Sequence, residues 1–212
     1  MPIPFTLTPL PWEAAALEPV IPARSIAYRH GIEQKGYVDA LNASAAGTTF
    51  AGLSLEEIAR ATAKAPKDTQ LALANSAGQL WNLEFFWRSL APRPGPPSAA
   101  LGLAIALDFG GVDLLVEALV EAGGSRLEGG WAWLTCRNGV LSVAATGPAR
   151  SPWEEGVSPL LAIDVWEHPY NLGRPALSKS LAAGLGKIIN WDFAAANFAK
   201  TVCWGATGGA SA

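Results

Sequence analysis

Hydrophobic positions recur at helical spacing through the first half of the chain. They predict a helix over residues 23–46, with Pro22 as the residue that starts it. Ser54 and Glu57 form a capping-box pattern, so a second helix is expected to begin after Ser54. A third helix is expected over residues 69–90, and it ends before APRPGPP, a stretch that cannot continue a helix. The first half of the chain is therefore predicted to be helical.

The second half of the chain mixes helical patterns with strand-like runs. Asn138-Gly139 lies between two such runs, and this dipeptide accepts the positive φ that a type I′ hairpin requires at both turn positions. The run PLLAIDVW predicts a third, buried strand. Helices are expected over residues 98–107, 112–121, 176–185 and 191–200. Helices followed by a hairpin, a strand and more helices indicate an α+β fold.

Proline and glycine mark the organisation of the chain. The first twenty residues hold several prolines and are expected to form an extended arm, and the stretch near residue 95 reads as a linker. We therefore expect two domains: an arm with an α-hairpin over residues 1–94, and an α/β domain over residues 95–212. The final segment GATGGASA is expected to be disordered.

Composition excludes several classes of function. Half of the 212 residues are hydrophobic and the net charge is -3, which favours a folded domain and gives no electrostatic support for nucleic-acid binding. No apolar run reaches the roughly 18 residues of a spanning helix, and the N-terminal residues lack the pattern of a signal peptide. Cys136 and Cys203 are far apart and are interpreted as free thiols in a reducing compartment. We expect a cytoplasmic protein with no membrane or nucleic-acid partner.

Asp164 and His168 follow the third predicted strand at a spacing of four residues, which is typical of half a metal site. The chain contains two histidines, and the second is His30, far away in the sequence. The other half of such a site must therefore be sought elsewhere.

Several motifs together resemble the iron/manganese superoxide dismutases over nearly the whole chain. They are PFTLTPLPW, IAYRHGIEQKGYVDALN, GQLWNLEFFW, GGWAWL, PLLAIDVWEHPY and IINWDFAAANFAK. The resemblance implies an N-terminal helical hairpin and a C-terminal domain of helices around a three-stranded antiparallel sheet. It also implies one iron or manganese ion, held by three histidines, one aspartate and a solvent molecule, which disproportionates superoxide.

The resemblance assigns the ligand positions residue by residue. Asp164 and His168 fall on two of the four ligands, but Arg29 and Leu83 stand where the family has histidines. His30 is one position beyond Arg29, and a rotation of about 100° per helical residue should turn its side chain away from the site.

Other family positions are partly retained. The pocket positions are kept at Tyr37, Gln79, Trp133 and Trp166. Glu33 replaces the histidine that pairs with the tyrosine of the substrate gate, and Asn171 replaces an interface tyrosine. The segment after Asn171 is also shorter than in the family, which leaves open whether the dimer is altered.

These replacements lead to a hypothesis about the pocket. Arg29 cannot act as a metal ligand, and we expect its guanidinium to form an ion pair with Asp164, which would otherwise be a costly buried charge. Glu167 and His168 correspond to a reciprocal bridge across the family's twofold interface. This bridge implies a homodimer, or a heterodimer with a superoxide dismutase paralogue.

Three functions follow from this reading. In the first, the protein has lost metal binding and dismutase activity, contains no cofactor, and acts as a structural or partner-binding protein. In the second, it is an enzyme of altered chemistry that uses the pocket around Arg29, Glu33, Tyr37, Asp164 and His168. In the third, it is a residual iron- or manganese-dependent dismutase with an unorthodox site.

Overall fold

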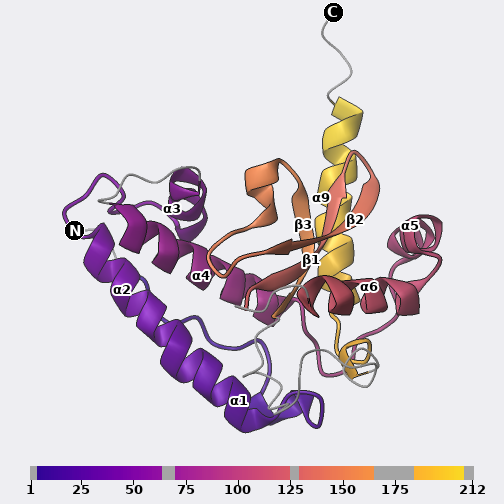
Figure 1. Cartoon of the computed structure of the whole chain (residues 1–212), viewed down its shortest axis with the longest axis horizontal. Helices are drawn as coiled ribbons and strands as arrows, with labels where there is room; N and C mark the ends of the chain where they lie inside the picture. The colour runs from indigo at the N-terminus through magenta and orange to yellow at the C-terminus, as the bar shows by residue number, and fades with distance from the viewer. Residues whose placement is uncertain (1–3, 64–69, 125–128, 165–183, 208–212) are drawn as a thin grey trace, which may run out of the picture.

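The N-terminal half of the chain is helical, as the sequence predicts. The computed structural model describes residues 4–63, 70–124, 129–164 and 184–207 (Figure 1). Helices α2 and α4 pack against each other, and α3 packs on α4. The elements of this half are the 3₁₀ turn Ala14–Leu17, α1 (Ala23–Tyr28), a π-helical stretch (Arg29–Gln34), α2 (Lys35–Ala45), α3 (Leu55–Thr62) and α4 (Leu71–Arg88).

The first predicted helix is present, but its centre has a different geometry. The expected continuous helix over residues 23–46 is divided by six π-helical residues, Arg29–Gln34, between α1 and α2. A π-helix is wound more widely than an α-helix and is frequent at functional sites. The stretch begins with Arg29, the residue that the sequence resemblance aligns with the first ligand position.

The N-terminal arm is fixed to this helical unit by polar contacts. The Phe5 amide donates to Asn42 Oδ1 at 2.8 Å, and Asn42 Nδ2 donates to the Phe5 carbonyl at 2.9 Å. Thr8 Oγ1 donates to Glu84 Oε1 at 2.8 Å. The capping box is also present, with the Ser54 amide donating to Glu57 Oε2 at 2.8 Å. Both features agree with the sequence analysis.

The sheet has three antiparallel strands in the order β2-β1-β3. The strands are β1 (Trp131–Arg137), β2 (Val140–Thr146) and β3 (Ser158–Asp164). Asn138 and Gly139 have φ values of 54° and 83°, so the predicted hairpin turn is confirmed. In the β1–β3 ladder Trp131 lies opposite Asp164. Asp164, the last residue of β3, lies at the end of the sheet that contacts Arg29 of the helical half.

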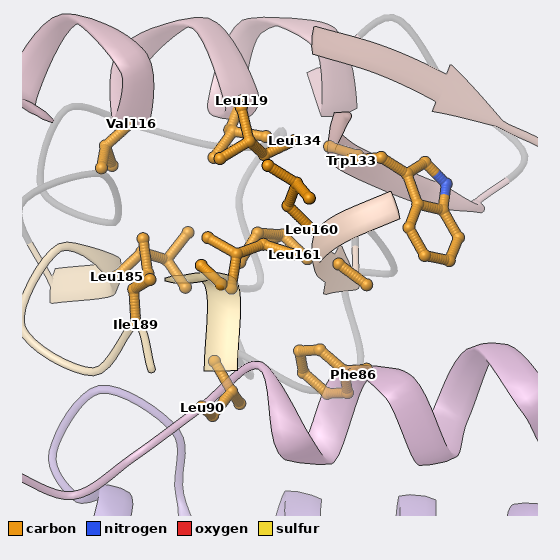
Figure 2. Close-up of a cluster of buried hydrophobic side chains, with 14 of the residues drawn as sticks. Phe86, Leu90, Val116, Leu119, Trp133, Leu134, Leu160, Leu161, Leu185 and Ile189 are labelled. Carbon is orange, nitrogen blue, oxygen red and sulfur yellow. The ribbon is translucent and has the colours of Figure 1, made fainter. Parts of the chain in front are cut away.

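Helices surround the sheet in the C-terminal half (Figure 1). They are α5 (Ala99–Phe109), α6 (Val112–Gly124) and α9 (Trp191–Thr207), and a 3₁₀ turn (Pro152–Glu155) precedes β3. Figure 2 shows side chains of α4, α6, β1 and β3 pointing toward one another in a shared core. The core therefore joins α4 of the N-terminal half to the sheet.

One expectation for the C-terminal half is corrected by the structure, and others are not tested by the described residues. Helix α9 extends to Thr207, beyond the predicted end at residue 200, so the first three residues of the segment expected to be disordered are helical. The apolar pattern predicted the core-facing part of this helix but not its continuation. Most of the helix expected over residues 176–185 lies outside the described residues, and the division near residue 95 remains a prediction.

The described helices can be compared with the length and apolarity that a membrane span requires. No single helix there combines the length and apolarity needed to cross a bilayer, although α5 and α6 reach both together across a 64° bend.

Candidate functional site

Arg29 is buried at the junction of the two halves of the molecule. Its side chain is 2% exposed, and its Nε donates to Asp164 Oδ2 at 2.9 Å. Asp164 is fully buried at the end of β3. The ion pair predicted from the sequence is therefore present, and it joins residues 135 positions apart.

A second carboxylate completes the Arg29 contacts. Arg29 Nη1 donates to Glu33 Oε2 at 2.7 Å, one helical turn away and 21% exposed. The guanidinium carbon also lies 5.9 Å from the ring centroid of Trp131, the residue opposite Asp164 in the sheet. Glu33 was expected at the position of the gate histidine, but not as a partner of Arg29. The spacing of four residues between opposite charges was the signal that could have found it.

The two carboxylates keep Arg29 charged. Burial alone would lower the pKa of Arg29, but attraction to Asp164 and the hydrogen bond to Glu33 outweigh it, so the pKa lies above its ordinary value. An arginine side chain offers five donors and no acceptor. Arg29 is thus a permanent cation placed against the one described carboxylate of the family ligand set.

Leu83 occupies the other replaced position. It is fully buried on α4 and belongs to the core cluster that also contains Phe86 and Trp133. Its side chain carries no atom that can coordinate a metal. Hydrocarbon packing therefore fills the pocket at this position.

Close packing fixes the helix that carries Leu83. Asn82 Nδ2 donates to the carbonyls of Pro148 and Arg150, both at 3.0 Å. A Cβ on Gly78 would clash with the Ala149 carbonyl oxygen, so only glycine permits this contact. The loop after β2 therefore sets the position of α4 relative to the sheet.

Tyr37, one of the pocket residues expected from the resemblance, lies beside the ion pair. Tyr37 is half-buried, and its hydroxyl interacts electrostatically with Arg29, Glu33 and Asp164. Burial, the largest cause, raises the pKa of Tyr37 above its ordinary value; Arg29 lowers it, and the two carboxylates raise it. The structure thus brings Tyr37 together with Arg29, Glu33 and Asp164.

Gln79 and Trp133 complete the described part of the pocket. Gln79 is buried, and its Oε1 has no hydrogen-bond donor among the described residues. Trp133 is fully buried, and its Nε1 donates to Thr146 Oγ1 at 2.8 Å. Trp166, Glu167, His168 and Asn171 lie outside the described residues.

His30 is directed to other partners, in agreement with the expected rotation. Its Nε2 lies 2.8 Å from the Thr8 carbonyl oxygen, and its ring makes an edge contact with Trp87. His30 therefore helps to hold the N-terminal arm.

The donor set can be compared with that of the family's metal ion. Within residues 4–63, 70–124, 129–164 and 184–207, no three His, Cys, Asp or Glu side chains are arranged as metal ligands. Asp164 Oδ2 accepts a hydrogen bond from the Arg29 guanidinium, and Leu83 has no atom that could bind a metal. These residues do not fit a site of three histidines and one aspartate.

Two family models together match most of the chain. The α-hairpin domain of iron/manganese superoxide dismutases matches residues 4–91, and the C-terminal domain of the same family matches residues 97–197. An iron superoxide dismutase of Synechocystis sp. is 40% identical over 92% of this chain and 98% of its own length. Iron superoxide dismutases of Nostoc sp. and Coxiella burnetii are 39% and 35% identical, each over 92% of this chain and 98% of their own lengths. The chain therefore belongs to the iron/manganese superoxide dismutase family.

Proposed function

We propose that this chain is a non-catalytic member of the superoxide dismutase family that holds no iron or manganese and acts as a dimerising, partner-binding protein. The observation that carries the proposal is the buried ion pair between Arg29 and Asp164. A metal ion near Asp164 would face a cation that cannot release its charge. Displacing the guanidinium would leave it buried without that partner, at a cost of several kcal/mol.

Leu83 supports the same conclusion by a different route. A metal ion at this point would contact buried hydrocarbon and lose hydration without gaining a ligand. Asp164 and His168 are then retained for structure, with His168 contributing to the dimer. A cytoplasmic location remains part of the proposal.

Elemental analysis of the purified protein tests the proposal directly. The chain is expressed in medium supplied with iron and manganese, purified without chelator, and assayed for both metals and for superoxide-dependent dye reduction. We expect neither a stoichiometric metal nor dismutase activity. A tightly held iron or manganese ion that turns over superoxide would contradict the proposal and favour an iron dismutase, the activity named for the relatives.

A double substitution shows whether the two side chains account for the difference. Arg29→His with Leu83→His supplies two imidazoles at the replaced positions, and we expect this variant to gain iron or manganese. A matched control, Lys35→His with Leu103→His, adds two imidazoles at exposed positions away from the pocket. Metal bound equally by the control would show non-specific coordination by histidine.

The dimer can be tested separately from the metal. We propose that two copies pair through Glu167 and His168, the positions of the family's interface bridge. Sedimentation of the purified protein should give a dimer that Glu167→Gln weakens, whereas Glu155→Gln should leave it unchanged. A chain that stays monomeric alone but binds an active superoxide dismutase would indicate the heterodimer instead.

A further inference from the structure

A groove of about 720 Å³ lies between the two halves of the molecule, away from the Arg29 ion pair. Segments from α3, α4, the β1–β2 hairpin, the turn before β3, β3 itself and α9 line it. Its volume falls in the usual range for small-molecule sites, roughly 300–1,000 Å³. Neither Arg29, Leu83 nor Asp164 lines this groove, so it is distinct from the family's metal position.

Aromatic rings form one wall of the groove. The rings of Trp81 and Trp153 have centroids 3.7 Å apart, and Trp81 stacks on Phe85 with centroids 5.0 Å apart. Trp81 and Trp153 are both partly exposed. The guanidinium carbon of Arg60 lies over the Trp153 ring, 4.3 Å from its centroid. The parts of the two indoles that stay exposed at the groove offer an incoming planar ring a rigid apolar contact.

Positive charge is concentrated around this wall. The lining includes Arg60, Arg137 and Lys200 against the single carboxylate of Glu56, in a chain whose net charge is -3. Arg60 Nε binds Glu56 Oε1 at 2.8 Å, so these two charges offset each other.

Arg137 and Lys200 carry the remaining charge. Arg137 donates to the Glu155 carbonyl, and Lys200 Nζ lies 3.4 Å from Asn197 Oδ1. Both side chains are exposed, and within the described residues neither forms an ion pair with a carboxylate. Among the residues that the structure describes, two cations without a carboxylate partner therefore lie at the groove beside its aromatic wall.

We propose that this groove binds a small planar anion, with an aromatic ring against Trp81 and Trp153 and a carboxylate or phosphate at Arg137 and Lys200. The planar guanidinium matches an oxyanion through paired hydrogen bonds, and the ammonium adds a second charge. The ring supplies apolar burial, and the anionic group supplies orientation and selectivity. The site is independent of the proposed loss of metal, because it uses none of the same residues.

Calorimetric titration tests the two parts of the ligand separately. The probes are 2-naphthoate and adenosine monophosphate, with 2-naphthamide and adenosine as neutral counterparts and inorganic phosphate as the ringless anion. At least one ringed anion should bind, and its neutral counterpart and phosphate should each bind roughly tenfold more weakly or worse. The anion that binds identifies whether a carboxylate or a phosphate is preferred. Raising the salt concentration should weaken that binding because the cations are exposed.

Substitutions then locate the site. Arg137→Gln with Lys200→Gln should weaken the bound anion at least tenfold, whereas Arg24→Gln with Arg93→Gln, two exposed arginines outside the groove, should leave its affinity unchanged. Circular dichroism verifies that both variants are folded. The proposal is overturned if no ringed anion binds, if neutral counterparts bind equally well, or if the Arg137/Lys200 variant binds like the parent.

Discussion

The two positions at which the family resemblance places histidine ligands, 29 and 83, differ in the way they stabilise the pocket. Position 29 carries a buried cation that is held by Asp164 and Glu33, so its surroundings depend on charge balance. Position 83 carries a buried leucine in the main core cluster, so its surroundings depend on packing. The difference shows that one buried pocket can be stabilised by charge compensation at one point and by hydrocarbon packing at another.

The largest effect is expected from removing the cation alone. Arg29→Met keeps most of the volume but takes the ion pair from buried Asp164, and should lower the free energy of unfolding by about 3–5 kcal/mol. Urea denaturation followed by circular dichroism measures the loss. The control Lys35→Met breaks the exposed Lys35–Asp39 pair and should cost no more than about 0.5 kcal/mol.

A second substitution distinguishes charge from shape at position 29. Adding Asp164→Asn to Arg29→Met removes the buried negative charge as well and should recover part of the loss. A small cost for Arg29→Met alone, below about 1 kcal/mol, would contradict the electrostatic account.

Truncation of the leucine should produce a somewhat smaller loss of a different kind. Leu83→Ala removes buried methyl groups and leaves a cavity in the core, at an expected cost of about 2–4 kcal/mol. Leu83→Met conserves volume and should cost less than about 1.5 kcal/mol. Equal losses for alanine and methionine would show that the role of Leu83 is not packing.

The smallest effect concerns the alkaline side of the stability curve. The pKa of Tyr37 is higher in the folded than in the unfolded protein, so its contribution is full below pH about 10 and is lost as pH rises through the folded pKa. Tyr37→Phe should therefore make the fall in melting temperature between neutral and strongly alkaline pH shallower.

Absorbance titration of the tyrosines relates this effect to the comparison. Because Arg29 lowers the pKa of Tyr37, Arg29→Met should move its ionisation to still higher pH, whereas Leu83→Ala should leave it in place. A shift of the same size in both variants would mean that general loosening of the pocket, and not the cation, controls Tyr37.

Local chemistry explains why much of the fold could be predicted from the sequence. The hairpin follows from the tolerance of Asn138 and Gly139 for positive φ, and the start of α3 follows from the Ser54–Glu57 capping box. The Arg29–Asp164 pair could be predicted because the family resemblance places both residues in one pocket, where a buried carboxylate needs compensation. In each case the residue types allow few other backbone conformations or interaction partners.

Other features depend on tertiary structure and were not predicted. The π-helical stretch Arg29–Gln34 is a shift in backbone hydrogen-bond register that residue propensity does not encode. The groove is assembled from six segments spread between residues 56 and 201, so no single motif indicates it. The role of Glu33 required knowing where the Arg29 side chain is directed.

The pairing of Arg29 with Asp164 also constrains how this sequence can change over time. A single step from Arg29 to histidine withdraws the buried cation, and a single step from Leu83 to histidine puts an imidazole into hydrocarbon. Each substitution alone is expected to give a less stable protein, and only the two together would supply a pair of imidazole ligands. On the proposed loss of metal, a four-ligand centre would therefore need both substitutions before either of them gives a benefit.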